Sequence, residues 1–262
     1  MTDSGRQIQS RENPGYRALL ALAQSGKARR QTRQTLLEGV HLCQAWTARW
    51  GPPPQVFASR AALAHPEIAA WLAQHRIAPT VLADGLLAPL TALQPEVALV
   101  AVVSTPAPPL PPQLDQDAVY LDRIQDPGNL GTLLRSCAAA GVHTVITAPQ
   151  TAAAWAPKVM RAAMGAHCAL SLHEAVPWSI VRSRTSARVL GTRITEAESL
   201  YRLDLRPPCL WIFGNEGQGL SEELCADVAG WVSIPQAPGV ESLNVAAAAA
   251  VCLFEQRRQR IA

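Results

Sequence analysis

The sequence of 262 residues contains no apolar run long enough to cross a membrane. Its longest apolar runs are Val97–Val103 and Val245–Phe254, whereas a membrane-spanning helix needs about 20 residues. The first ten residues are polar and lack the apolar core of a signal peptide. We therefore expect a cytoplasmic protein with no membrane partner.

The sequence also lacks the cysteine patterns that bind metals. Its six cysteines form no C-x-x-C pair and no Cys/His spacing typical of zinc sites. Most of them lie within apolar runs, which favours buried, reduced thiols. We expect no metal site. The cysteines are Cys43, Cys137, Cys168, Cys209, Cys225 and Cys252.

Charge is scarce, at 16% of residues, and apolar residues make up 48%. This composition supports a sizeable core and excludes global disorder. The net charge of +3 is too small to identify a nucleic-acid partner. The basic excess is N-terminal, because residues 1–105 hold 10 Lys/Arg and 6 Asp/Glu, whereas residues 106–262 hold 13 and 14.

A proline-rich segment divides the chain. Five of the seven residues Pro106–Pro112 are proline, which removes amide donors and favours an extended backbone. We predict a small α/β domain over residues 1–104, a linker over residues 105–114 and a larger α/β domain over residues 115–262. In the first domain the predicted helices are Tyr16–Ala23 and His41–Trp50, and the predicted strands are Gln55–Phe57, Thr80–Leu82 and Val97–Val103.

Strand-like and helical patterns alternate in the larger domain. Apolar residues at positions 130, 133, 134 and 137 form one helical stripe, and Gly141 can end that helix. Such alternation argues for a mostly parallel sheet covered on both faces. The predicted strands are Val119–Ile124, Thr144–Thr147, Arg188–Leu190, Cys209–Phe213 and Trp231–Ile234, and Val245–Arg260 is predicted as the last helix.

Polar clusters follow three of these strands, at the edge where open α/β sheets bind ligands. In the first cluster, Arg135 points away from the apolar stripe, as a site residue or a solvated surface arginine would. Asn129 is either a site residue or the N-cap of the helix that follows. In the third, Ser242 or Asn244 could cap the last helix. The clusters are Asp126–Arg135, Phe213–Glu223 and Ile234–Asn244.

The second cluster contains three glycines in six residues. They let the backbone approach a ligand closely. Their spacing is G-x-x-G-x-G rather than the G-x-G-x-x-G of dinucleotide binding, which argues against a nucleotide-dependent oxidoreductase.

Taken in order, the three clusters resemble the three motifs of the SpoU/TrmH class of SPOUT RNA 2′-O-methyltransferases. The matching patterns are N-x-G-x-x-x-R in the first cluster, G-N-E-G-x-G-L-S in the second, and I-P followed by E-S-L-N-V in the third. This resemblance covers residues 118–258. Three N-terminal features, Asn13-Pro14, Lys27–Arg33 and Leu36–His41, resemble the L30e-like substrate-binding domain of that class. The resemblance implies a SPOUT α/β fold with a trefoil knot, and a homodimer whose site combines motifs from two subunits.

The resemblance also implies that S-adenosyl-L-methionine is the cofactor. Matching of motifs assigns Thr192, Gly214, Ile234 and Leu243 to its pocket, largely through backbone groups. One departure concerns the third motif. Family members often read I-P-M-x-G, whereas this chain has Ile234-Pro-Gln-Ala-Pro-Gly239, which puts the affinity for the cofactor in question.

The implied reaction moves a methyl group to a ribose 2′-hydroxyl, a poor nucleophile while it is protonated. Arg135 matches the essential arginine of the family, which is written either as a base or as an electrostatic stabiliser. Because a guanidinium stays protonated in proteins, we favour the stabilising role. The other matching polar positions are Asn129, Glu216, Ser242 and Asn244.

The N-terminal basic residues suggest an RNA contact, in particular Arg29, Arg30 and Arg33. The alternative is a solvated or disordered arm. Only RNA offers the 2′-hydroxyl, and the separate N-terminal module favours ribosomal RNA over transfer RNA. Two other functions stay open, a tRNA 2′-O-methyltransferase and a non-catalytic RNA-binding protein with the same fold. The remaining basic residues of this set are Arg6, Arg11, Arg17 and Lys27.

Overall fold

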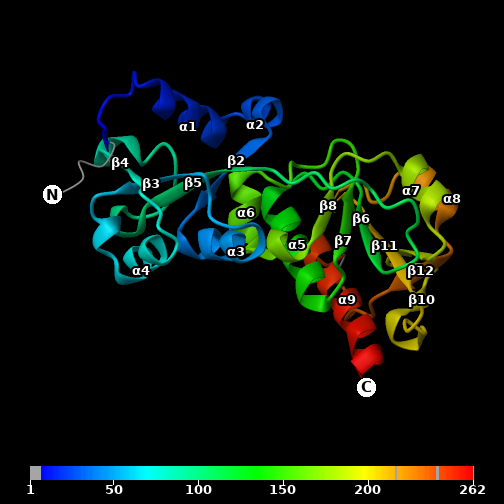
Figure 1. The fold of residues 1–262 in the computed structure, drawn as a ribbon. Coiled ribbons are helices and arrows are strands. Elements are labelled where there is room, and N and C mark those ends of the chain that lie inside the picture. Colours follow the sequence, from blue (N-terminus) through cyan, green and yellow to red (C-terminus); the bar gives the residue numbers. More distant parts are fainter. Residues whose placement is uncertain (1–6, 216, 240–241, 262) are drawn as a thin grey trace. The chain divides into compact units, whose positions relative to one another are not determined.

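The computed structural model describes residues 7–215, 217–239 and 242–261, and the chain forms two units (Figure 1). The N-terminal unit comprises Met1–Thr105 and Trp155–Arg161, and the C-terminal unit comprises Pro106–Ala154 and Ala162–Ala262. The division at residues 105 and 106 falls at the start of the proline-rich segment. The sequence pattern did not indicate that Trp155–Arg161 belongs with the first unit.

The N-terminal unit contains a five-stranded mixed sheet in the order β1-β4-β3-β5-β2. Strand β4 pairs in parallel with β1 and β3, and β5 pairs antiparallel with β3 and β2. The first five residues of β5 are buried, as expected for a strand between two others. The strands are β1 (Gln7–Ile8), β2 (Gln34–Glu38), β3 (Gln55–Ser59), β4 (Thr80–Leu82) and β5 (Leu99–Ser104).

Helices α1 to α4 accompany this sheet, and the unit also takes in residues 157–161 of helix α6 (Pro157–Ala163). Helix α1 begins at Pro14, where the side chain of Asn13 accepts hydrogen bonds from two backbone N–H groups of the first turn. Its residues Tyr16, Leu19 and Leu22 are buried in the core of the unit. The helices are α1 (Pro14–Gln24), α2 (Gly26–Thr32), α3 (Val40–Trp50) and α4 (Pro66–Gln74).

The C-terminal unit contains a seven-stranded sheet in the order β10-β12-β9-β11-β6-β7-β8, and each strand pairing among the described residues is parallel. The expected mostly parallel α/β fold is confirmed. The strands are β6 (Ala118–Leu121), β7 (Thr144–Thr147), β8 (Ser171–His173), β9 (Arg188–Thr192), β10 (Glu198–Ser199), β11 (Cys209–Phe213) and β12 (Gly230–Ser233). The helices from residue 127 onward are α5 (Pro127–Ala140), α6 (Pro157–Ala163), α7 (Trp178–Arg184), α8 (Glu222–Asp227) and α9 (Val245–Ile261).

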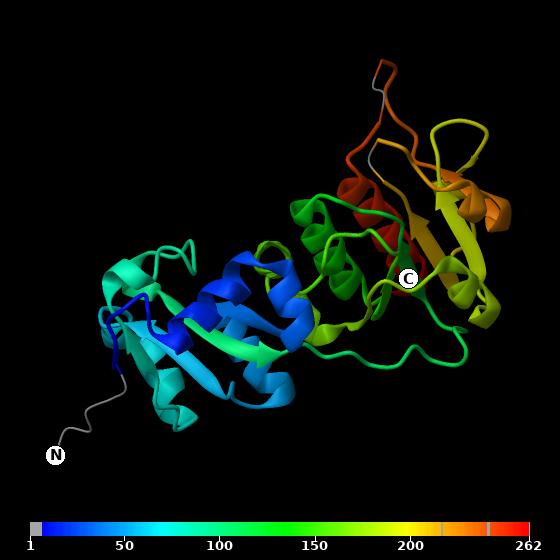
Figure 2. The same ribbon diagram turned by 90° about the horizontal axis from the view of Figure 1, so that it is seen from above.

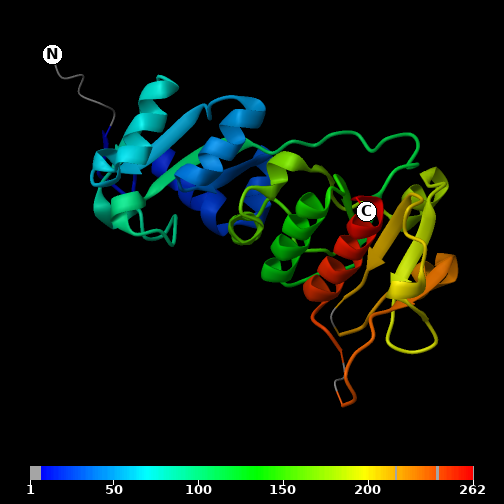
Figure 3. The ribbon, with the colours of Figure 1, turned by 90° about the horizontal axis from the view of Figure 1, so that it is seen from below.

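Helices α5 and α9 pack side by side in the C-terminal unit, as Figures 2 and 3 show in green and red. Helix α5 buries the predicted stripe, including Leu130, Leu133 and Cys137, and ends at Gly141, whose φ of 85° is left-handed. Within the described residues, no helix combines the length and the apolar character needed to cross a membrane.

The six cysteines are free thiols. Four are buried, and Cys225 is exposed, which departs from the general expectation of burial. Burial raises the pKa of Cys137 and of Cys252 to about 12. These thiols are therefore protonated at neutral pH and serve as small apolar side chains.

Candidate active site

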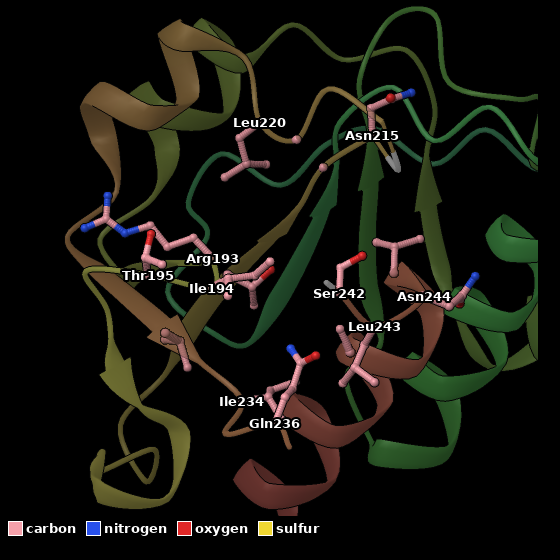
Figure 4. Close-up of a pocket in the computed structure, with 16 residues that line it drawn as sticks. Arg193, Ile194, Thr195, Asn215, Leu220, Ile234, Gln236, Ser242, Leu243 and Asn244 are labelled. Atoms are coloured by element: carbon pink, nitrogen blue, oxygen red, sulfur yellow. The ribbon is translucent and has the colours of Figure 1, made fainter. Parts of the chain in front are cut away.

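A pocket of about 620 Å³ lies at the carboxyl edge of three neighbouring strands, β12, β9 and β11 (Figure 4). It is lined by the segments that follow these strands and by the start of α9. In a parallel sheet the carboxyl ends meet at one edge, so segments far apart in sequence converge there. The pocket lining includes the four predicted cofactor residues, Thr192, Gly214, Ile234 and Leu243, together with Ser242 and Asn244.

The loop after β11 is built on Gly214. A Cβ at this position would lie 2.5 Å from the carbonyl carbon of Gly219, closer than real Cβ atoms approach. Asn215 and Gly219 exchange two backbone hydrogen bonds of 3.1 and 2.9 Å. The Oδ1 of Asn215 accepts from the N–H groups of Gly217 and Gln218, at 3.0 Å each. Only glycine fits at position 214, because backbone meets backbone there.

Asp122 and Arg123 hold the same loop from the end of β6. The buried Asp122 accepts a hydrogen bond from the backbone N–H of Ser221, at 3.0 Å. Arg123 donates to the Asp122 carboxylate and, at 2.9 Å, to Oε1 of Gln218. The hydrogen bond to Asp122 raises the pKa of Arg123. The sequence analysis did not assign either residue to the site, although two adjacent charged residues near the end of a predicted strand are a signal for such a role.

Asn244 connects the third cluster to the first. Its Oδ1 accepts hydrogen bonds from Ala246 and Ala247, at 2.9 and 3.3 Å, which caps α9. Its Nδ2 donates to Oδ1 of Asn129, at 2.9 Å. The alternative reading of Asn129, as the N-cap of the helix after the first cluster, does not hold, because Asn129 lies inside α5. Asp126 is the N-cap and accepts from the backbone N–H of Asn129 at 2.7 Å, because the helix begins at Pro127.

Arg135 does not line this pocket. It is exposed on α5, on the face opposite the buried stripe, and no hydrogen bond or ion pair joins it to the described part of the chain. Glu216, the remaining predicted catalytic residue, lies outside the described residues. Within one chain, the structure therefore brings together Asn129, Ser242 and Asn244 but not Arg135.

Apolar side chains in the pocket are unusually open to solvent. Ile194 is 58% exposed and Leu243 is 39% exposed. Gln236 also lines the pocket, and its Oε1 is buried without a hydrogen-bond donor from the described residues. The guanidinium of Arg193 lies 4.6 Å from the ring centroid of Trp231, and its Nε donates to the Glu196 carbonyl. Open apolar walls with a few polar atoms are typical of small-molecule sites.

This lining fits S-adenosylmethionine. The adenine is flat and largely apolar, which matches the exposed Ile194 and Leu243. The unpaired Oε1 of Gln236 offers an acceptor to a donor on the cofactor. Gly214 and Gly219 both line the pocket, so backbone groups form part of one wall.

The predicted RNA-binding arginines differ from one another. Arg29 is partly buried, and its Nη1 donates to the carbonyls of Leu22 and Ala23 at the end of α1, at 2.7 and 3.3 Å. Burial, and then the neighbouring Arg30, lower the pKa of Arg29. Arg30 and Arg33 are exposed. Lys27, Arg29 and Arg30 lie on helix α2 rather than on a disordered arm, and Arg6 lies outside the described residues.

A sequence model of the SpoU rRNA Methylase family matches residues 117–254. The chain is 35% identical to an uncharacterized tRNA/rRNA methyltransferase of Synechocystis, over 99% of this chain and 96% of that protein. It is 39% identical to a 23S rRNA (guanosine-2′-O-)-methyltransferase of Bordetella pertussis over 54% of this chain, and that match spans 59% of the relative.

Solved structures agree with the fold. An AdoMet-bound rRNA methyltransferase from Sinorhizobium meliloti superposes with a TM-score of 0.82 at 27% identity, over 97% of each chain. The SpoU methyltransferase AviRb from Streptomyces viridochromogenes, in complex with AdoMet, gives a TM-score of 0.83 at 29% identity, over 95% of this chain and 99% of that chain. From the three clusters, the parallel sheet and these matches, the chain belongs to the SpoU rRNA Methylase family.

Proposed function

We propose that this protein transfers the methyl group of S-adenosylmethionine to a ribose 2′-hydroxyl of RNA, with ribosomal RNA as its substrate. The observation that carries the proposal is the pocket at the carboxyl edge of β9, β11 and β12, because the residues matched to the cofactor line it. Two similar solved structures contain AdoMet, and similar proteins are named as 23S rRNA 2′-O-methyltransferases.

Backbone and apolar groups hold the cofactor in this proposal. Thr192, Gly214, Ile234 and Leu243 surround its adenosine portion, and the cofactor when bound supplies a methyl group activated by a sulfonium. Asn215 and the Asp122–Arg123 pair keep the loop after β11 in the shape that the pocket requires. Such fixed positioning favours a direct transfer, because it removes the need to order the reactants during the reaction.

Arg135 stabilises the alkoxide that forms as the 2′-hydroxyl loses its proton. Its guanidinium remains charged, so it acts through charge and hydrogen bonds and not as a base. It can also hold the adjacent phosphate with two parallel hydrogen bonds. Water or the phosphate accepts the proton. The linked amides of Asn129 and Asn244 orient the ribose, and Ser242 helps to hold the third cluster or the nucleotide. For Glu216, which lies outside the described residues, the family resemblance implies a role in ordering the second cluster or Arg135.

A homodimer completes the site in this proposal. Arg135 lies on the exposed face of α5 and is not among the described residues that line the pocket of its own chain, which supports its supply by a second copy. On the neighbouring helix α9, the large apolar side chain of Phe254 is 47% exposed, which suits burial against another subunit. Each pocket then works with the partner subunit's Arg135.

The test is methyl transfer to RNA taken from a strain that lacks the gene. With labelled S-adenosylmethionine, the wild-type protein should label ribosomal RNA, and mapping of 2′-O-methyl groups should find a site that is missing in that strain. Labelling of transfer RNA alone would favour the tRNA alternative. Cofactor binding without labelling of any RNA would contradict the enzymatic proposal and favour a non-catalytic RNA-binding protein.

A further inference from the structure

We infer that Gln236 recognises the adenine of the cofactor, with its Oε1 accepting a hydrogen bond from the exocyclic amine. Gln236 lies in the Ile234–Gly239 segment of the third cluster, and its carboxamide carries an oxygen that can accept hydrogen bonds. The inference rests on the proposed function, since it takes S-adenosylmethionine as the ligand of the pocket. It adds a specificity-determining side chain to a site otherwise assigned largely to backbone groups.

The first observation is the unpaired state of this oxygen. Oε1 of Gln236 is buried, and none of the described residues donates a hydrogen bond to it. Buried polar atoms in folded proteins are nearly always paired, and leaving one unpaired costs free energy. Because Gln236 lines the pocket, a bound ligand is the available source of a donor. Figure 4 shows its carboxamide extending toward the middle of the pocket.

The second observation is what surrounds the carboxamide. Ile234 and Leu243 line the same pocket as Gln236, and Leu243 is 39% exposed. Aliphatic walls of this kind suit the faces of a planar ring. The charged side chain among the described lining residues is the positive Arg193, which disfavours a charged ammonium in the pocket. A neutral N–H donor on an aromatic ring is the better match, and the adenine amine is that donor.

The test compares two ligands that cannot transfer a methyl group, S-adenosylhomocysteine and its analogue with purine in place of adenine. The analogue keeps the ring but lacks the amine. By calorimetry, the wild-type protein should bind the adenine ligand about 10-fold more tightly, because the analogue leaves Oε1 unpaired. In Gln236→Met this preference should fall to about 2-fold or less.

Gln116→Met is the matched control, since Gln116 is exposed in the same unit and does not line the pocket. It should keep the wild-type preference. An equal preference in wild type and Gln236→Met would overturn the inference while leaving the cofactor assignment intact. Failure of the wild-type protein to bind either ligand would contradict the cofactor assignment, and the inference would fall with it.

Discussion

At the scale of single residues, the site depends on a few positions where the available space or the hydrogen bonds require one residue type. Gly214 is fixed by the backbone of Gly219, and Asn244 both caps α9 and bonds to Asn129. The three motifs predicted the identities of these residues through the family resemblance. They did not predict the Asp122–Arg123 support, because its partners Gln218 and Ser221 lie 95 to 99 residues away in sequence.

Gly214→Ala tests the close approach of the two backbone segments. The added Cβ would force the loop apart, so we expect a loss of about 1–3 kcal/mol in the free energy of unfolding and much weaker binding of S-adenosylhomocysteine. Gly217→Ala is the control, because a Cβ there has its nearest neighbour at 3.7 Å. Denaturant unfolding and calorimetry measure the two effects. Equal behaviour of the two variants would refute the role given to Gly214.

At the scale of elements, periodicity predicted the regular parts well. The strands at residues 144–147 and 209–213 have the predicted bounds, and α9 starts at the predicted residue. Helices α2 and α4 were not predicted, and α2 has only seven residues, too few to show a clear apolar repeat. Helices α6 and α7 were expected only as helical stretches between strands, without bounds. The placement of Trp155–Arg161 in the N-terminal unit depends on contacts, such as the hydrogen bond from Thr35 to the Trp155 carbonyl, that no local pattern encodes.

The exposed Arg30 of helix α2 and Arg33, the residue that caps the end of this helix, should contribute to RNA binding. We expect Arg30→Gln with Arg33→Gln to weaken RNA binding and to lower the slope of log K against log salt by about 1.5, because two phosphate contacts are lost. Filter binding over a range of salt concentrations measures this slope. The control pair Arg60→Gln with Arg76→Gln removes the same charge from exposed positions in the same unit. An identical slope in both pairs would show that Arg30 and Arg33 do not contact phosphate.

The short 3-10 helix at Ala166–Ala169 should make stability depend on pH. Burial lowers the pKa of His167 from 6.5 to about 4. The unfolded state therefore binds more protons between these values, so stability is complete above pH 6.5 and falls by about 3 kcal/mol as the pH drops to 4.

His167→Gln should remove this part of the pH dependence, because glutamine does not titrate and can still donate to the Ala154 carbonyl, which His167 contacts at 2.8 Å. Urea unfolding between pH 4.5 and 7.5 gives the comparison. The same substitution at the exposed His143 controls for replacement of a histidine. An unchanged dependence in His167→Gln would contradict the assigned cause.

At the scale of the whole molecule, the proposal requires two subunits for one reaction. Each chain carries the pocket that we assign to the cofactor, and its Arg135 lies on α5 and does not line that pocket. Closed two-fold dimers place the same surface of both subunits in contact, so two equivalent sites form. The sequence suggested this arrangement only through the family resemblance, because periodicity carries no information about a second chain.

Mixing two inactive variants tests this arrangement most directly. Arg135→Ala keeps the pocket, and Leu243→Asp damages the pocket but keeps Arg135; each alone should label no RNA. After subunits exchange in an equal mixture, half of the dimers carry one intact site, so about one quarter of wild-type methyl transfer should return. A mixture as inactive as its components would contradict the shared site and place Arg135 with the pocket of its own chain or outside the reaction.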